Sequence, residues 1–163
     1  MVSLKFLSDI EVFKGLTKDE LEAIANICSI KRFEEGEDVF SKDALPEEMF
    51  ILNSGRCDVK ISVGGPAEVY TIYPLNPGDI FGELGFIDGS TRSATIKCIN
   101  DVEAVALSRE KFATLCSEKP RIGYVVMKNL AIILTQRLRE TDKEFKNFYF
   151  QKRVSFRKLF HTG

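Results

Sequence analysis

The sequence predicts an α+β fold: an antiparallel β-roll or jelly-roll barrel with flanking N-terminal helices and a long C-terminal helix. Three observations support this prediction. A capped helical segment comes first, residues 31–108 then break into short strands separated by turns, and a heptad repeat follows them. Many short strands with no helix between consecutive ones indicate a sandwich or barrel rather than a parallel sheet.

The N-terminal helix is predicted by its cap and by its apolar period. Thr17 can serve as the N-cap residue, and Glu20 three residues later completes a capping-box pattern. Apolar residues then recur at Leu21, Ile24, Ala25 and Cys28. This spacing places them on one face of a helix, which is typical of a helix packed on a core.

The central region, about residues 31–108, is predicted to form the β-roll. Cys57, Val59 and Ile61 alternate with polar residues, which is the pattern of a strand with one buried face. The segments EVYTIYPL, SATIKCI and EAVALS are rich in β-branched and aromatic residues. Turn sequences such as NSG, NPGD and DGST separate these segments.

The C-terminal region is predicted to be helical again. Ser108 can cap a first helix, which ends before Pro120, and a long helix follows from about residue 121 to 150. Apolar positions of this helix alternate in steps of three and four, a heptad repeat with one polar member. The repeat comprises Tyr124, Met127, Ala131, Leu134, Leu138, Thr141, Phe145 and Phe148. We expect a homodimer through this seam; the alternative is a helix that lies on its own β-domain.

Charge is distributed unevenly along the chain. The formal net charge of the 163 residues is −1, but the segment after Glu144 carries five basic side chains and no acidic one. The sequence therefore predicts an acidic domain over residues 1–145 and a basic tail over residues 146–163. The tail is either a solvated terminus or a weak electrostatic contact for anionic lipid, nucleic acid or an acidic partner.

Composition argues against several classes of protein. No apolar run approaches the roughly 20 residues that a membrane-spanning helix needs, so a membrane protein is not expected. The four cysteines form no C-x-x-C pair, and we expect reduced thiols in a cytoplasmic protein. A metal-dependent cupin enzyme would need several histidines, and the chain has only His161. A haem sensor needs an axial His, Cys or Met; Cys57 or Cys98 could supply it, but the pair Glu83 and Arg92 described below would then have no use. No cofactor or metal is expected.

The most informative stretch is PGDIFGELGFIDGSTRSATIKC, residues 77–98. It places Glu83 next to Gly82 and a single arginine, Arg92, nine residues after the glutamate. A carboxylate accepts hydrogen bonds from hydroxyls, and a guanidinium offers a planar pair of donors to phosphate. Glycines allow backbone N–H groups to approach an anion closely. A compact nucleotide has both a phosphate and ribose hydroxyls, so the stretch suggests a nucleotide site.

The segment FGELGFIDGSTRSAT resembles the phosphate-binding cassette of the cyclic nucleotide-binding domains, including the step from glutamate to arginine. The flanking segments RFEEGEDVF, FILNSGRCDVKI and NPGDIFGE are similar to the strands and turns of that family. The resemblance covers roughly residues 10–145. It implies a regulatory domain that binds cAMP or cGMP and changes conformation, rather than an enzyme.

The resemblance also implies roles for individual residues. Glu83 would accept a hydrogen bond from the ribose 2′-OH, and Arg92 would pair with the exocyclic phosphate oxygen. Ser93 follows the arginine, and a serine at this position is compatible with either cAMP or cGMP. Thr141 and Asp142 would contact the base from the C-terminal helix. Backbone N–H groups would complete the phosphate site at Gly82, Leu84, Gly85 and Ala94.

Two departures from the family pattern limit what the resemblance implies. Thr91 occupies the position where many members have proline before the arginine. Transcription activators that resemble the catabolite activator protein continue into a helix-turn-helix domain, whereas this chain ends at Gly163, so no DNA-binding domain is expected. The partners implied are a cyclic nucleotide, a second copy of the chain and an unidentified downstream protein. The alternative function is a β-roll without ligand that serves as a dimerisation or protein-interaction module, in which Glu83 and Arg92 form a structural salt bridge.

Overall fold

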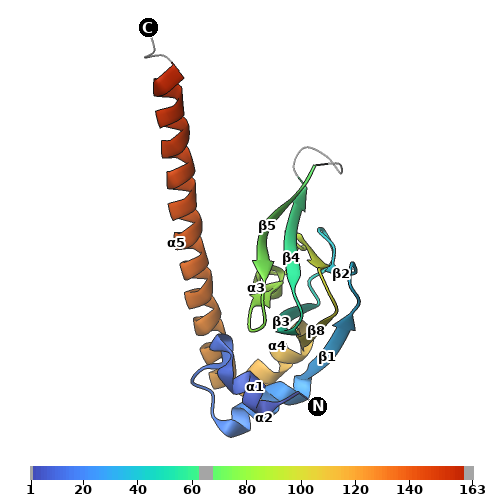
Figure 1. The fold of residues 1–163 in the computed structure, drawn as a ribbon. Coiled ribbons are helices and arrows are strands. Elements are labelled where there is room, and N and C mark those ends of the chain that lie inside the picture. The colour runs from blue at the N-terminus through green and yellow to red at the C-terminus, as the bar shows by residue number, and fades with distance from the viewer. Residues whose placement is uncertain (1, 63–67, 160–163) are drawn as a thin grey trace.

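The computed structural model describes residues 2–62 and 68–159, with side chains as far as Phe150. Figure 1 shows a β-roll with short helices at its base and one long helix that rises beside it. This architecture confirms the predicted fold class. The N-terminal part contains helix α1 (Leu4–Asp9), the 3-10 helix η1 (Glu11–Phe13) and helix α2 (Lys18–Ile27).

Helix α2 begins at the predicted capping box. The backbone N–H of Thr17 donates to Glu20 Oε2 at 2.8 Å, and the backbone N–H of Glu20 donates to Thr17 Oγ1 at 3.4 Å. These two bonds satisfy donors that the first helical turn leaves unpaired. Leu21, Ile24 and Ala25 of the predicted apolar face are buried. The prediction was wrong for Cys28, because the helix ends at Ile27 and Cys28 begins strand β1 (Cys28–Phe33).

The roll consists of two antiparallel four-stranded sheets, with the orders β1-β8-β3-β6 and β2-β7-β4-β5. All of the described strand pairs are antiparallel, and β8 lies between β1 and β3. The strands are β1 (Cys28–Phe33), β2 (Asp38–Phe40), β3 (Glu48–Ser54), β4 (Cys57–Ser62), β5 (Val69–Leu75), β6 (Ile80–Phe81), β7 (Thr95–Cys98) and β8 (Val102–Ser108).

Strand β3 separates two hydrophobic cores because its side chains alternate between faces. Phe50 and Leu52 face the core between the sheets, where Phe50 stacks on Phe81 with ring centroids 5.4 Å apart. Met49 and Ile51 face the second core, between one sheet and the helices. The short helix α3 (Glu83–Asp88) follows β6 and carries the glutamate of the predicted site.

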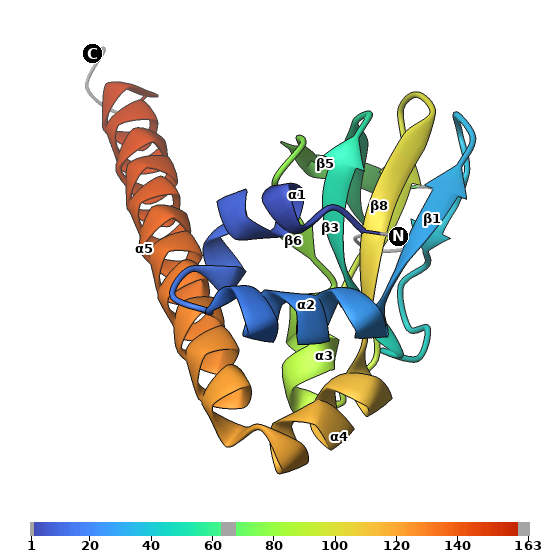
Figure 2. The same cartoon turned by 90° about the horizontal axis from the view of Figure 1, so that it is seen from below.

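The two C-terminal helices are α4 (Arg109–Glu118) and α5 (Pro120–Leu159). Ser108 caps α4 as predicted, since its Oγ accepts a hydrogen bond from the backbone N–H of Lys111 at 3.4 Å. The 40 residues of α5 span about 60 Å. Figures 1 and 2 show the first part of α5 against the N-terminal helices and the remainder extending away from the roll.

Helix α5 packs on its own domain through a face other than the predicted seam. Ile122, Val126, Leu130 and Ile133 are buried in the helical core. The seam residues lie on another side of the helix and are mostly exposed, for example Leu138 at 62%. The helix thus has two apolar faces, one of which is covered within the monomer. The backbone of α5 continues past residue 145, so the basic residues up to Lys158 lie on this helix.

Candidate functional site

The predicted cassette begins at a sharp turn between β6 and α3. Gly82 has a φ of +73°, in the left-handed region that favours glycine. A Cβ atom at this position would lie 2.6 Å from Nη1 of Arg92 and 3.1 Å from the ring of Phe40. Both the backbone conformation and the available space therefore require glycine here. The turn brings the backbone of Gly82 against the guanidinium of Arg92.

Arg92 is buried, with 5% of its surface exposed. Its Nη1 donates to the Gly82 carbonyl at 2.8 Å, and its Nη2 donates to the Glu48 carbonyl. The guanidinium carbon lies 4.1 Å from the centroid of the Phe40 ring, within the range of a cation–π contact. These contacts fix the orientation of the guanidinium.

One donor of Arg92, its Nε, is buried and has no hydrogen-bond partner in the described part of the chain. Burial lowers the pKa of Arg92 from its ordinary value, and the carboxylates of Glu48, Glu83 and Glu47 oppose that shift. An unpaired buried donor on a charged group is costly, so an anion that accepted this hydrogen bond would be stabilised.

Glu83 is also buried, with 6% of its surface exposed. Its Oε1 accepts a hydrogen bond of 2.8 Å from Nη1 of Arg137 on α5, and Nη2 of Arg137 donates to the Ile80 carbonyl at 2.7 Å. The ion pair of Glu83 is therefore with Arg137, rather than with Arg92 as the structural salt-bridge alternative would require. Sequence reasoning missed Arg137. A usable signal was its position four residues after Ile133, the last buried residue of α5.

The structure brings most of the predicted site residues together around one small cavity of about 60 Å³. Phe40, Tyr73 and Phe81 supply part of its wall from the strands. The predicted residues that line it are Gly82, Glu83, Leu84, Gly85, Arg92, Ser93 and Ala94. A volume of this size is far below the roughly 300 Å³ at which small-molecule pockets begin. The cavity is therefore narrower than a nucleotide in this conformation.

The two predicted base contacts on α5 are separated from each other. Thr141 lines a second cavity of about 430 Å³ between β5 and α5, together with Tyr73 and Arg137. Asp142 lines a different cavity of α5, with Lys143 and Lys146. Successive helix positions are about 100° apart, which explains why these neighbours face different directions.

Tyr73 is a further residue that sequence reasoning missed. Its side chain lines both the cassette cavity and the cavity that contains Thr141. It is 43% exposed, and desolvation of the covered part of its side chain raises the pKa of Tyr73 above its ordinary value. Strand alternation alone does not reveal such a position, because it depends on where α5 lies relative to β5.

The arrangement is suited to binding a small molecule that has both an anionic group and a hydroxyl. Arg92 and the turn at Gly82 supply donors, and Glu83 supplies an acceptor. Within residues 2–62 and 68–159 no cluster of three potential metal ligands is found, and no helix there is long and apolar enough to cross a membrane.

Known proteins share this architecture. A family model described as the cyclic nucleotide-binding domain matches residues 30–119. The chain is 29% identical over 142 residues to the cyclic AMP receptor protein of Thermus thermophilus, covering 86% of this chain and 63% of that protein. It is 30% identical over 116 residues to a cGMP-dependent protein kinase of Caenorhabditis briggsae, covering 71% of this chain and 16% of the kinase. The chain thus spans less than two thirds of these relatives.

Solved structures agree with these relationships. The catabolite activator protein of Thermus thermophilus superposes with a TM-score of 0.74 at 29% identity, over 86% of this chain and 63% of that one. A cyclic nucleotide-binding domain from Methylobacillus flagellatus has a TM-score of 0.77 at 22% identity, over 86% and 79% of the two chains, which shows the shared fold. Since the family model also matches more than half of the sequence, the chain belongs to the cyclic nucleotide-binding domain family.

Proposed function

We propose that this domain binds cAMP or cGMP and acts as a regulatory module without catalytic activity. One observation carries the proposal: the buried Arg92, whose Nε has no hydrogen-bond partner among the described residues, lines the same small cavity as the buried Glu83. A charged donor and a charged acceptor, both desolvated and already oriented, fit a ligand that has a phosphate and a hydroxyl. A degenerate β-roll without ligand has no need for either buried charge.

The cyclic phosphate would lie against Arg92 and the α3 turn. Its oxygens would accept hydrogen bonds from Nε of Arg92 and from backbone N–H groups near Gly82, Leu84, Gly85 and Ala94. The ribose 2′-OH would donate to Glu83, whose Oε1 is already held by Arg137. Ser93 is exposed beside Arg92, where its hydroxyl would contact the phosphate or a purine.

The base would extend from the cassette toward α5. Tyr73 lines both cavities along that path, and Thr141 lies in the second one. Asp142 faces another side of α5 and would contact a base only from a second copy of the chain or after α5 moves. The similar proteins named above include a cyclic AMP receptor protein and a cGMP-dependent kinase, so they support neither nucleotide over the other.

Binding would require a conformational change, since the cassette cavity is smaller than a nucleotide. The ion pair between Glu83 and Arg137 joins the cassette to α5, so a movement of one element would displace the other. We propose that a downstream protein detects this movement. The four free cysteines fit the cytoplasmic location predicted from the sequence.

The exposed seam of α5 would form a homodimer. Large apolar side chains such as Tyr124, Leu138 and Phe145 are 62–67% exposed along one heptad face. A helix face of this length and composition is stabilised when it packs on an identical face. The packed face of the same helix is already occupied by the monomer core, so it does not compete for the seam.

Isothermal titration calorimetry with cAMP and cGMP tests the proposal, on protein first unfolded and refolded to remove any ligand carried through purification. We expect saturable heat for at least one nucleotide and none for 5′-AMP, which lacks the cyclic phosphate. The absence of heat and of a thermal shift with both cyclic nucleotides would reject the proposal and favour the interaction-module alternative.

A further inference from the structure

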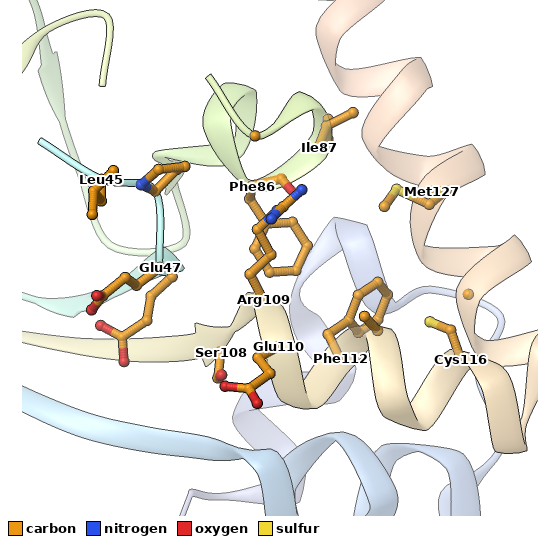
Figure 3. Close-up of a pocket in the computed structure, with 15 residues that line it drawn as sticks. Leu45, Glu47, Phe86, Ile87, Ser108, Arg109, Glu110, Phe112, Cys116 and Met127 are labelled. Atoms are coloured by element: carbon orange, nitrogen blue, oxygen red, sulfur yellow. The ribbon is translucent and has the colours of Figure 1, made fainter. Parts of the chain in front are cut away.

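A cavity of about 980 Å³ lies on the other side of α3 from the cassette. It is bounded by the β2–β3 connection, α3, α4 and the start of α5, and we call it the rear groove (Figure 3). Among the described residues, none lines both the rear groove and the cassette cavity. The groove is therefore a separate site that the proposed nucleotide contacts do not use.

The end of the groove nearest α5 is apolar. Phe86 of α3 and Phe112 of α4 form its floor, with ring centroids 5.4 Å apart. Ile87 and Met127 remain 38% and 37% exposed beside them. Figure 3 shows Phe112, Cys116 and Met127 gathered at this end. Exposed apolar side chains around one concavity are typical of a binding surface.

The opposite end of the groove is acidic. Glu47 lies there beside Leu45, which is 72% exposed. Glu48 and Glu110 also line the groove. Glu48 pairs with Lys31, whereas the carboxylates of Glu47 and Glu110 have no ion pair or hydrogen bond among the described residues. The acidic end thus carries negative charge that the described part of the chain does not pair.

Arg109 lies between the two ends and is held by α3. Its Nε donates to the Phe86 carbonyl at 3.0 Å. A Cβ atom on Gly89 would lie 3.1 Å from its Nη2, so the guanidinium lies close against the C-terminal end of α3. Arg109 therefore connects the groove to the helix that carries Glu83.

We infer that the rear groove docks a segment of a partner protein in one orientation. A large apolar side chain of the partner would pack against Phe112 and Ile87, and a lysine or arginine would face Glu47 and Glu110. Buried apolar anchors supply most of the affinity at such surfaces, and complementary charge sets orientation and specificity. A partner with the reversed order of charge and apolar residue would place a cation on the apolar floor.

The position of the groove also suggests that docking responds to the nucleotide, a point that rests on the proposed function. Phe86 and Ile87 face the groove from the helix whose other residues, Glu83 and Gly85, line the cassette cavity. If the partner binds one arrangement of α3 more tightly than another, partner and nucleotide influence each other's binding. The factor by which the nucleotide changes the affinity for the partner then equals the factor by which the partner changes the affinity for the nucleotide.

A substitution that fills the groove tests the inference. Ala113 is exposed on α4 and faces the rear groove, whereas its neighbour Thr114 is exposed on another side of the same helix. Short peptides of random sequence, displayed on phage, are selected for binding to the full chain. We expect enrichment of peptides with a large apolar residue and a nearby basic residue. Ala113→Trp should weaken their binding by about tenfold or more, and Thr114→Trp by less than about twofold.

A charge test supplements the steric one. Glu47→Lys with Glu110→Lys should weaken the same peptides, whereas Glu118→Lys, an exposed position elsewhere on α4, should not. Selected peptides that bind Ala113→Trp as tightly as the unmodified chain, or a selection that enriches none, would overturn the inference. A change in self-association caused by Ala113→Trp in sedimentation would show that a second copy, rather than a partner protein, occupies the groove.

The effect of the nucleotide on peptide binding is measured separately. Peptide affinities measured with and without saturating cAMP should differ. Equal affinities would reject the coupling to the nucleotide but not the docking site. If the chain binds no cyclic nucleotide, the proposed function fails, and the peptide measurements still decide whether the rear groove is a docking site.

Discussion

Oε1 of Glu83 accepts a 2.8 Å hydrogen bond from Nη1 of Arg137, so a single ion pair joins the cassette helix to the long C-terminal helix. Glu83 is nearly inaccessible, while the Arg137 side chain is about one third exposed. A buried carboxylate is stable as an anion only when it is paired. Arg137 therefore stabilises the charge that the proposed site uses as a ribose acceptor.

Arg137→Ala should lower the free energy of unfolding by about 1–3 kcal/mol, because Glu83 would remain buried without its charged donor. Urea denaturation measures this change. Arg137→Lys keeps the charge but cannot donate in a fork to both Glu83 and the Ile80 carbonyl, so an intermediate loss is expected. Arg139→Ala, at an exposed position of the same helix, should have little effect. An equal loss in both alanine variants would contradict this role for the ion pair.

Arg92→Ala should weaken cyclic nucleotide binding by roughly 2–5 kcal/mol, the scale for removing one member of a buried charge pair. Titration calorimetry measures the change, and Arg56→Ala, at an exposed position between β3 and β4, serves as the control. A variant that folds and binds cAMP or cGMP as tightly as the unmodified chain would exclude Arg92 as the phosphate contact.

Glu83→Ala should weaken binding by about 1–3 kcal/mol, since one hydrogen bond to a charged acceptor is lost. The ligand 2′-deoxy-cAMP gives a sharper measurement, because it lacks the hydroxyl in question. The unmodified chain should discriminate against 2′-deoxy-cAMP, and Glu83→Ala should bind the two ligands nearly equally. Discrimination that persists in Glu83→Ala would assign the ribose contact to another residue.

Local sequence patterns predicted most of the fold because the structure of these segments is local in origin. The capping box at Thr17, the cap at Ser108 and the alternation around Val59 each depend on residues a few positions apart. The cassette residues lie in one continuous stretch, so spacing alone brought Glu83 and Arg92 into one hypothesis.

The remaining features depend on tertiary placement, which no local pattern contains. Arg137 lies 54 residues from Glu83 and reaches it only because α5 packs through Ile133 and its neighbours. Tyr73 acquires its position between two cavities in the same way. The heptad count selected the exposed face of α5, because counting apolar residues does not reveal which of them the domain covers.

Gly82→Ala separates steric fit from backbone strain when it is compared with Gly36→Ala. Both glycines have positive φ, +73° and +81°, so both alanines should cost about 1–2 kcal/mol of stability. Only at Gly82 would the new Cβ meet Arg92, whereas at Gly36 nothing lies within 4 Å. We expect nucleotide affinity to fall in Gly82→Ala alone. Equal affinities in the two variants would mean that the guanidinium tolerates displacement.

Tyr73→Leu should weaken binding of a cyclic nucleotide by about 1–3 kcal/mol, the usual contribution of an aromatic ring to a stacked base. Tyr73→Phe keeps the ring and removes the hydroxyl, so it should retain most of the affinity but change the ratio of cAMP to cGMP binding if the hydroxyl contacts the purine. Competition titrations with both nucleotides measure the ratio. Unchanged affinity in Tyr73→Leu would place the base elsewhere.

The exposed seam of α5 should drive association of two chains. Leu138 and Phe145 lie one heptad apart and are 62% and 67% exposed, so burying them against identical residues would remove a large apolar surface from water. Leu138→Glu with Phe145→Glu places like charges in that interface and should give a monomer in sedimentation equilibrium. Gln136→Glu changes an exposed position off the seam and should leave the dimer intact. Because both variants keep the buried face of α5, their monomer fold should be unchanged by circular dichroism. An unmodified chain that sediments as a monomer, both alone and with saturating cyclic nucleotide, would assign the seam to a different partner.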